Sequence, residues 1–386
     1  MTNWDEVLDE FSLRGKVRHL STMVMASHRR GLDDKIRDLR DGFNRDPVTF
    51  LHKVVVTEMN RFVDAAGAYF GVPPTETAQC GSTSQGLGYI YSGIKLLPGE
   101  RVLTTKHEFA ASTVPLLARE DRQDTKFVDV LPQLFSTTPD PVDIVKRLRD
   151  AIQPKTRLLA LTWVYSSTGV KSPIKDITAM VREVNATRAP ENRLLVCVDG
   201  VHGFGIENVN FSDLGCDFFV SGTHKWIYGP RGTGVMYGTK EAWALVKPIV
   251  WTSKPHTPNG VHAYEHDFAV ADAFAWLMGI GKTEIEARVH ALATRLKDGL
   301  SLITGVQLIT PRDRALSSGI VCFDVTGMKS EDVVRKLSED FDIIATQSAT
   351  DPMIGGGKHV RLSPGVINDY DDIDAVLTAV GRLAQP

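Results

Sequence analysis

The stretch Phe218-Phe-Val-Ser-Gly-Thr-His-Lys-Trp-Ile-Tyr-Gly-Pro-Arg-Gly-Thr-Gly234 places a lysine directly after an apolar strand and a short polar turn. A deep position there would desolvate the ammonium group of Lys225 and lower its pKa, as an imine-forming lysine requires. Taken alone, a lysine in such a turn is more often a surface residue. The segments that precede it in the chain favour the first interpretation.

An acidic residue follows another apolar strand, 26 positions before Lys225. The run 194–198 ends in Asp199-Gly-Val-His202, and ligands of open α/β sheets bind at the carboxyl ends of the strands. A carboxylate buried there needs a cationic partner, which a protonated pyridine nitrogen would supply. A helix-cap or turn role for Asp199 fits this segment alone about equally well. An Asp followed by such a lysine is the arrangement by which proteins hold pyridoxal 5'-phosphate (PLP).

Two further segments offer groups for such a cofactor. The turn Gly81-Ser-Thr-Ser-Gln-Gly86 precedes a helical pattern, so its N–H and hydroxyl groups suit a phosphate. Ser and Thr caps are, however, common at helix starts of every kind. His107 follows a predicted strand and supplies an imidazole that could lie on a cofactor ring, although a solvated loop histidine is the commoner case.

The pattern of the whole chain predicts an α/β protein. From about residue 75 to 238, strand-like and helix-like segments alternate, which is typical of a sheet built from β-α-β units. A long helical pattern and further short strands after residue 266 predict a second, smaller α+β unit, and residues 1 to about 70 are mostly helical in pattern. The predicted strands are 101–106, 126–131, 157–165, 193–199, 218–221, 234–237, 319–325, 342–346 and 359–363.

Composition narrows the class of protein. The chain has 386 residues, enough for about two domains, and a net charge of −3 without a long basic run, which argues against nucleic acid as a partner. No apolar run approaches the roughly 20 residues of a membrane span, and the acidic N-terminus does not resemble a secretory signal, so we expect a cytoplasmic protein. The four cysteines form no CxxC pair, which predicts neither a disulfide framework nor a metal site.

These motifs, in this order, resemble the class V aminotransferase family of PLP-dependent enzymes over nearly the whole chain. The motifs are 81–86, His107, Ser166-Ser-Thr-Gly169, Asp199-Gly-Val-His202 and Ser221-Gly-Thr-His-Lys225. Segments 163–173, 229–234 and 360–364 are most similar to the isopenicillin N epimerase-like branch, which also contains C–S lyases. The resemblance implies fold type I, with a mostly parallel seven-stranded sheet in the large domain, and a homodimer. We expect an N-terminal segment 1–25 that contributes to the small domain, a large PLP-binding domain 26–260 and a small C-terminal α+β domain 261–386.

The resemblance also implies roles for single residues. Lys225 would bond PLP and move the substrate's α-proton, Asp199 would pair with the pyridine nitrogen, and His107 would stack on the ring. The other expected cofactor-binding residues are Ser82, Thr83, Ser84, Gln85, Ser166, His202, Ser221 and His224. Arg361 would clamp the substrate α-carboxylate with its planar fork, and His28 and Arg231 are the other expected substrate-binding residues.

Two departures from the family pattern matter. Cysteine desulfurases carry a nucleophilic cysteine on the loop before the carboxylate-binding arginine, whereas residues 345–358 contain none, which disfavours persulfide-forming desulfuration. Where relatives have Gly-Thr followed by Asp to reach the neighbouring subunit's phosphate, this chain has Tyr264-Glu-His-Asp267. The contact across the dimer is therefore open, and His256, His262 and His266 are either pocket residues or solvated loop residues.

We therefore predict an enzyme that acts on the α-amino group of a small amino-acid-derived substrate through an external aldimine and a quinonoid. The favoured reaction is β-elimination from a cysteine S-conjugate, which is that of a C–S lyase. Epimerisation, transamination and decarboxylating oxidative deamination use the same lysine, Asp and arginine and stay open. A cofactor-free scaffold of the same fold is the alternative from another class, and the presence of Lys225 and Asp199 disfavours it.

Overall fold

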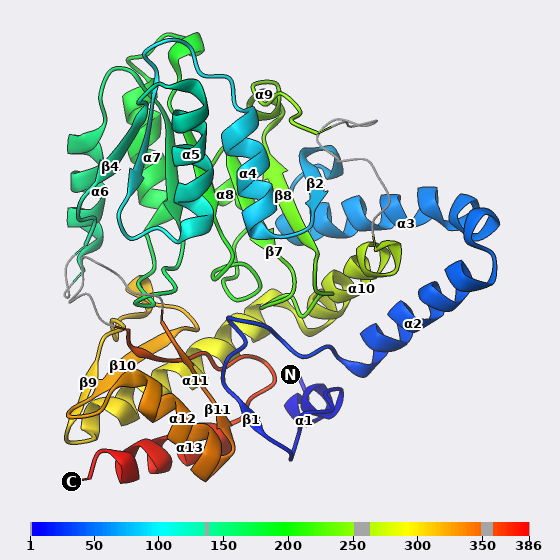
Figure 1. Ribbon diagram of the computed structural model, residues 1–386, viewed down its shortest axis with the longest axis vertical. Helices are drawn as coiled ribbons and strands as arrows, with labels where there is room; N and C mark the ends of the chain where they lie inside the picture. The colour runs from blue at the N-terminus through cyan, green and yellow to red at the C-terminus, as the bar shows by residue number, and fades with distance from the viewer. Residues whose placement is uncertain (1, 136–138, 251–262, 349–357, 386) are drawn as a thin grey trace.

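The computed structural model describes residues 2–135, 139–250, 263–348 and 358–385, and a seven-stranded sheet lies at the centre of its larger part (Figure 1). The strand order is β2-β8-β7-β6-β5-β3-β4, and only β8 runs antiparallel to its neighbours, which confirms the mostly parallel sheet. The strands are β2 (Thr77–Cys80), β3 (Arg101–Thr105), β4 (Val128–Leu131), β5 (Thr156–Thr162), β6 (Leu195–Asp199), β7 (Phe218–Gly222) and β8 (Gly234–Gly238).

Helices cover both faces of this sheet, because its central strands are apolar on both faces. In β5, Leu158 packs with helices α4 (Thr83–Gly93) and α5 (Ala110–Gln123), whereas Leu159 packs with α6 (Pro141–Ala151) and α7 (Ile174–Asn185). All seven residues of β5 are buried, and its apolar run 158–161 predicts burial on both faces. The short helices α8 (Phe211–Leu214) and α9 (Lys240–Trp243) complete this part.

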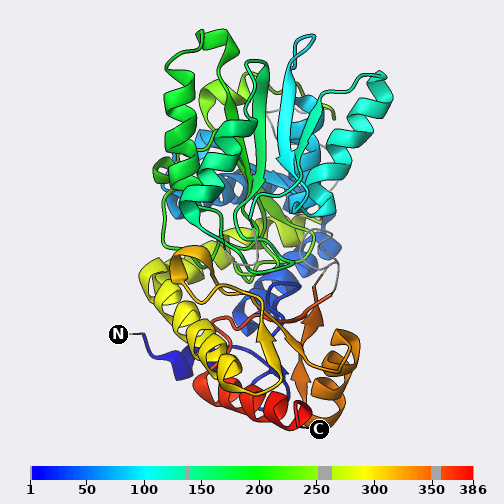
Figure 2. The ribbon, with the colours of Figure 1, turned by 90° about the vertical axis from the view of Figure 1, so that its left-hand side faces the viewer.

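The smaller part lies below the large sheet in Figures 1 and 2 and has its own antiparallel sheet. Its strand order is β12-β13-β10-β9, and helices α12 (Ser330–Phe341) and α13 (Tyr370–Leu383) pack against it. The strands are β9 (Val306–Leu308), β10 (Val321–Val325), β12 (Thr346–Gln347) and β13 (Val360–Leu362). The N-terminal segment joins this part, because β1 (Arg18–His19) pairs in parallel with β11 (Ile343–Ile344).

Four helices connect the two parts or project from them. Helix α1 (Trp4–Asp9) begins the described chain, and α2 (Arg30–Arg45) and α3 (Pro47–Phe70) form a hairpin that extends to the right in Figure 1. Asp46 ends α2 and caps α3 by accepting a hydrogen bond from the Thr49 N–H, and Pro47 fits the first position of the new helix. Helix α10 (Tyr264–Ile280) packs against both arms of the hairpin.

The strand prediction missed short edge strands and merged two others. β2 and β9 lie at the edges of their sheets and lack the apolar run that marks a buried strand. The predicted strand 342–346 is two strands, β11 and β12, which pair in different sheets on either side of Ala345.

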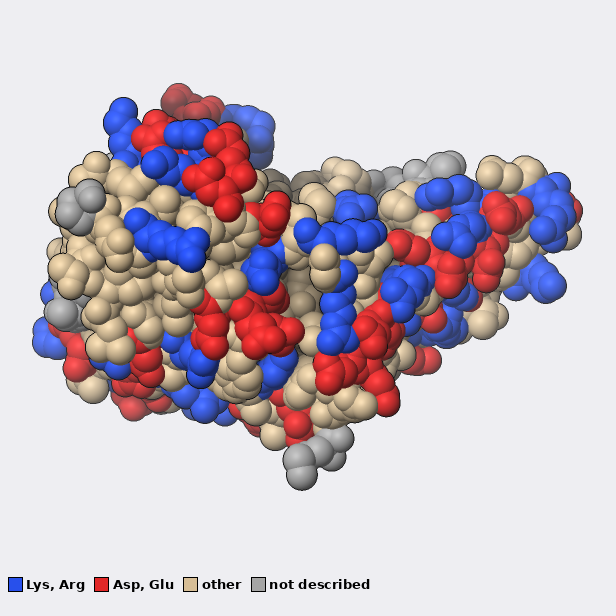
Figure 3. Space-filling view, turned by 90° about the horizontal axis from the view of Figure 1, so that it is seen from below, with Lys and Arg blue, Asp and Glu red and all other residues tan. Residues whose placement is uncertain are grey.

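No helix among the described residues is both long and apolar enough to cross a bilayer. The face seen in Figure 3 carries interspersed side chains of both charges.

The two cores meet along helix α11 (Lys282–Leu302). Its first half, with Ile285 and Val289, packs in the core of the large part, and its second half, with Leu296, packs in the smaller core. This packing favours a domain boundary within α11 over one near residue 260, which lies in the undescribed segment 251–262. The division of the chain into domains stays a prediction.

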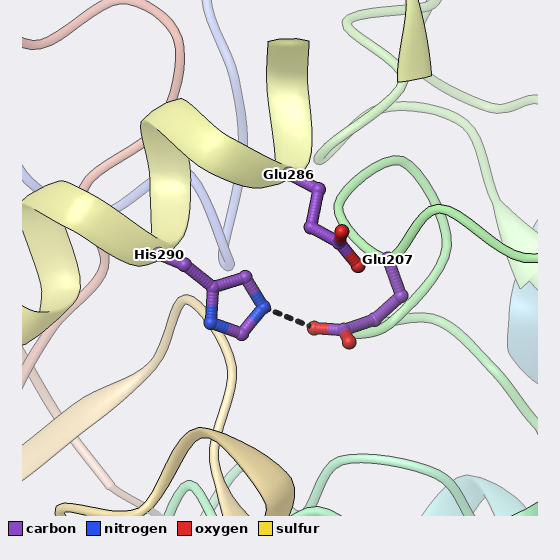
Figure 4. Close-up of side chains that lie close together, drawn as sticks. All are labelled: Glu207, Glu286 and His290. Carbon is purple, nitrogen blue, oxygen red and sulfur yellow. Dashed lines mark hydrogen bonds and ion pairs between the residues drawn. The ribbon is translucent and has the colours of Figure 1, made fainter. Parts of the chain in front are cut away.

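A buried ionic network joins the large part to α11 at this junction. Glu207 accepts hydrogen bonds from Lys171 Nζ at 2.8 Å and from Ser318 Oγ at 2.5 Å, and it lies 2.8 Å from His290 Nε2 (Figure 4). Burial alone would raise the pKa of Glu207, but the His290 and Lys171 contacts outweigh burial and lower the pKa to about 2. Glu286 completes a group of three potential metal ligands with Glu207 and His290. The Lys171 ammonium already occupies one oxygen of Glu207, so an ion-pair network explains the group better than a cation site does.

Glu207→Gln should lower the free energy of unfolding by about 3 kcal/mol at pH 7, because the largely buried Lys171 ammonium loses its counter-charge. Urea unfolding of both proteins under the same conditions measures the loss. The folded-state pKa of Glu207 lies below the unfolded value of about 4.3, so its contribution is complete above that pH and is lost as the pH falls towards 2. The difference between wild type and variant should therefore shrink below about pH 4.5. Glu339→Gln, which breaks an exposed pair with Arg335, is the control and should change stability by less than about 1 kcal/mol.

Candidate functional site

A cavity of about 640 Å³ opens at the carboxyl ends of β3, β5, β6 and β7 and is closed on one side by the smaller part. Parallel sheets of this kind bind ligands at this edge. Ten of the predicted site residues line it: Ser82, Thr83, Ser84, His107, Ser166, Asp199, His202, His224, Lys225 and Arg361. Segments far apart in the sequence therefore converge on one space.

Lys225 follows β7 in a turn whose backbone is tightly fixed. The Gly229 N–H donates to the Thr223 carbonyl at 2.8 Å, and Tyr228 holds a left-handed φ of 55° while its hydroxyl accepts the Val366 N–H at 3.0 Å. Burial lowers the pKa of Lys225 to about 8, although the nearby Asp199 charge partly raises it. At pH 7 about a tenth of this amine is therefore neutral and nucleophilic, a far larger fraction than for an ordinary lysine of pKa about 10.4.

Asp199 ends β6 and is only 3% exposed. Its carboxylate accepts hydrogen bonds from the Val201 N–H at 3.2 Å and from Ser112 Oγ at 3.5 Å. Burial raises the pKa of Asp199 to about 6, and these donors and the Lys225 charge limit the rise. Among the described residues no lysine, arginine or histidine forms an ion pair with Asp199, so the cavity leaves room for a cationic group beside it.

The N-terminus of α4 supplies the polar end of the cavity. Ser82 caps the helix by accepting the Gln85 N–H at 3.1 Å, and Thr83 Oγ1 accepts the Gly222 N–H at 2.7 Å. Both hydroxyl hydrogens remain available to a phosphate, as do N–H groups of the first helical turn. Burial lowers the pKa of His224 to about 4, helped by the Lys225 charge, so the imidazole is neutral at pH 7.

Four predicted site residues do not line the cavity. The Gln85 side chain turns back to accept the Gly81 N–H, and the Ser221 hydroxyl is fully buried and donates to the Gly222 carbonyl at 2.9 Å. His28 Nδ1 pairs with Asp33 at 2.8 Å, and Arg231 Nε contacts Met25 Sδ at 3.1 Å. His266 bonds the Arg231 carbonyl, while His256 and His262 lie outside the described residues.

Two ring side chains of one segment, His107 and Phe109, line the cavity. His107 is 5% exposed and stacks on Phe135, with ring centroids 4.0 Å apart and an interplanar angle of 20°. Phe109, two residues later, is 52% exposed, lines the same cavity and caps α5. Phe109 is therefore a second candidate to lie over a bound ring, and sequence reasoning missed it because a single phenylalanine carries no motif.

Arg361 reaches the cavity from β13 of the smaller part. Its Nη1 donates to the Ser166 carbonyl at 2.8 Å and its Nε donates to Thr346 Oγ1 at 3.3 Å. No Asp or Glu among the described residues forms an ion pair with this guanidinium, although it is only 8% exposed. His202 also lines the cavity; burial lowers its pKa well below the usual value, and Trp226 Nε1 donates to its Nδ1 at 3.4 Å.

None of the four cysteines lines the cavity. All are buried, and burial raises the pKa of each thiol, to about 12 for Cys80 and Cys322. Such thiols are poor nucleophiles, because the thiolate is the reactive form.

The sequence profile of the family described as aminotransferase class V matches residues 68–376. This chain belongs to the class V aminotransferase family. It is 23% identical to isopenicillin N epimerase of Streptomyces clavuligerus, over 99% of each chain, and 27% identical to the cysteine desulfurase CsdA of Escherichia coli, over 76% of this chain and 73% of the relative. A solved structure of the cystine C–S lyase C-DES with its product cysteine persulfide superposes with a TM-score of 0.84 at 19% identity, covering 96% of this chain and 99% of that one.

The cofactor of this class V enzyme is PLP, and the cavity fits it. The buried Asp199 has no cationic partner among the described residues, Lys225 has a depressed pKa, and the α4 N-terminus offers hydroxyl and N–H donors. These are the groups that a pyridinium nitrogen, an aldehyde and a phosphate respectively require.

The apo protein should turn yellow on addition of PLP, and Lys225→Ala should abolish that absorption band. The rate at which the band appears should rise with pH through about 8, because the neutral amine is the nucleophile. Lys297→Met is a matched control: burial also lowers the pKa of Lys297 to about 8, but its ammonium donates to Ser317 Oγ at 2.6 Å, outside the cavity. A yellow Lys225→Ala protein, or a colourless Lys297→Met protein that still folds, would contradict the assignment.

Proposed function

We propose that this class V enzyme is a C–S lyase that eliminates the sulfur substituent from a cysteine S-conjugate. The observation that carries the proposal is the convergence of Lys225, Asp199 and Arg361 on one cavity that no cysteine lines. In the reaction the Cβ–S bond breaks, the sulfur leaves as a thiol after taking up a proton, and the remainder hydrolyses to pyruvate and ammonia.

The proposed roles follow from the contacts of each side chain. PLP, when bound, supplies an electron sink for negative charge at the substrate's α-carbon. We assign its phosphate to Ser82, Thr83, Ser84 and His224, its ring nitrogen to Asp199 and its ring faces to His107 or Phe109. Ser166 and His202 would contact the ring edge. Gln85 and Ser221 would support the phosphate turn from behind.

Lys225 and Arg361 are the residues proposed to act on the substrate. The neutral Lys225 amine would take the α-proton and hold it within the cavity. Arg361 would bind the α-carboxylate, and its bond to the Ser166 carbonyl fixes the guanidinium in advance. His28 and Arg231 do not line the cavity, and Arg231 contacts Met25, so any influence of the two on substrate binding would be indirect.

The thiols distinguish this proposal from cysteine desulfuration. A desulfurase that stores sulfur as a persulfide on its own cysteine needs an accessible thiolate near the substrate. Here all four cysteines of the chain are buried and have raised pKa values. A lyase that releases the sulfur fragment directly needs no such group.

Epimerisation is the second candidate. The similarity to isopenicillin N epimerase extends over 99% of both chains, whereas the similarity to CsdA covers about three quarters. Lys225, Asp199 and Arg361 would serve an epimerase equally well, because loss of the α-proton is common to both reactions.

Incubation of the PLP-loaded enzyme with S-alkyl and S-aryl cysteines should release thiol, pyruvate and ammonia in equal amounts without a keto-acid acceptor. Coupled detection of pyruvate, together with a thiol reagent, measures the products. Loss of optical activity without pyruvate would show epimerisation, and product formation only with a keto acid would show transamination. Either result rejects the lyase proposal.

Arg361→Lys tests the carboxylate contact within the same assay. The variant keeps the charge but loses the bidentate fork, so KM should rise by about 10- to 100-fold. The yellow band should be unchanged, because Arg361 is assigned to the substrate. An unchanged KM would remove Arg361 from its proposed role.

We also propose a homodimer, supported by the projecting helix α3. Val48 and Val56 on this helix are 63% and 64% exposed, and helices that are apolar on several sides are normally covered. Light scattering should give twice the chain mass of 42.5 kDa, and Val48→Lys with Val56→Lys should shift it towards the monomer. Val142→Lys, at a 76% exposed position on α6, is the control. A wild type at the monomer mass would contradict the proposal.

The buried free thiols support a reducing compartment, so we propose the cytoplasm, which cell fractionation tests.

A further inference from the structure

A second carboxyl group, Glu108, lines the cavity and has no part in the reaction proposed above. Three hydroxyl groups donate to it: Thr105 Oγ1 at 2.9 Å and Tyr165 OH at 3.0 Å to Oε1, and Thr162 Oγ1 at 2.5 Å to Oε2. An ionised carboxylate accepts hydrogen bonds and donates none, so three converging donors stabilise the charged form.

The charge of Glu108 has no cationic partner among the described residues. Burial raises its pKa to about 7, the three hydroxyl donors oppose that rise, and the charge of Asp199 adds to it. A carboxylate that is desolvated and unpaired is costly unless a cation arrives. Since Glu108 faces a ligand cavity, the cation can come with the ligand.

Sheet order places Glu108 beside Asp199. β3, β5 and β6 are consecutive in the sheet, and Glu108 lies just beyond the carboxyl end of β3 while Asp199 ends β6. Thr162, the last residue of β5, lies between them and bonds Glu108. Both carboxylates line the cavity, and the charge of Asp199 acts on Glu108.

We propose that Glu108 is a positioning residue for PLP, whose negative charge acts with that of Asp199 to hold the protonated pyridine nitrogen. Asp199 provides the direct partner and Glu108 deepens the negative potential at that end of the cavity. The other titratable groups close to Glu108 are His107, which precedes it in the chain, Tyr165 after β5, and Tyr91 on α4.

The test compares two ligands that differ only at the ring nitrogen. Apo wild type and Glu108→Gln are titrated with PLP and with 1-deaza-PLP, in which a CH group replaces that nitrogen, and tryptophan fluorescence gives each Kd. At pH 8 the preference for PLP over the deaza ligand should fall about tenfold in Glu108→Gln. The loss should be smaller at pH 6, because Glu108 carries its charge only above a pKa of about 7.

Two variants separate charge from structure. Glu108→Asp keeps the charge and should retain most of the preference for PLP. Glu120→Gln makes the same change at a buried glutamate at the far end of α5, which holds the Phe127 and Val128 N–H groups at 2.6 Å, and should leave the preference unchanged.

Equal weakening of both ligands in Glu108→Gln, with no change in their ratio, would show a merely structural role and overturn the proposal. If Glu108→Gln fails to fold, Tyr165→Phe provides a second route. It removes one donor to the carboxylate, which disfavours the charged form, so the preference for PLP should again fall. An unchanged preference in Tyr165→Phe would then overturn the proposal.

Discussion

The burial of two opposite charges at the carboxyl edge of one sheet is the constraint on which the rest of the structure depends. Asp199 and Lys225 follow neighbouring parallel strands, and Asp199 pairs in register with Val220 of β7. Each charge is desolvated, yet each raises the stability of the other's charged form. The strands β6 and β7 that hold these residues are fully buried, so packing on both faces fixes their backbones. The residue after Asp199 must be glycine for the same tight packing, because a Cβ at Gly200 would lie 1.7 Å from the Phe219 ring.

The N-terminal segment connects this edge of the large sheet to the smaller part through backbone hydrogen bonds. The Ser363 N–H donates to the Leu20 carbonyl at 2.7 Å, and the Met23 N–H donates to Ser363 Oγ at 3.1 Å. Three residues later the Ala26 N–H donates to the His224 carbonyl at 2.9 Å. Residues 20–26 therefore link the end of β13, which carries Arg361, to the turn that carries Lys225. The distance between the carboxylate-binding group and the amine is set by backbone hydrogen bonds, which side-chain motifs do not record.

This explains which parts of the molecule the sequence predicts. The strands with unbroken apolar runs and the residues that follow them directly, Asp199 and Lys225, are specified locally, so the sheet and its functional edge could be predicted. Gln85 and Ser221 belong to the same motifs, but the direction of their side chains depends on backbone partners within the turn, and both point away from the cavity. Glu108 could not be predicted, because its role requires knowing that β3 and β5 are neighbours although Thr162 lies 54 positions later.

The charged side chains that line the cavity include two cations and two carboxylates, because the pKa values of two of its histidines keep them neutral. Burial keeps His202 and His224 neutral at pH 7, and the Lys225 charge reinforces this effect. What remains is Lys225 and Arg361 together with Asp199 and Glu108. Arg361 is free of acidic partners among the described residues, so an α-carboxylate can neutralise it, and bond formation at Lys225 removes much of the second positive charge. The two carboxylates then have only the ring nitrogen of the cofactor as a counter-charge, and that is the site at which a PLP enzyme needs a proton to be held.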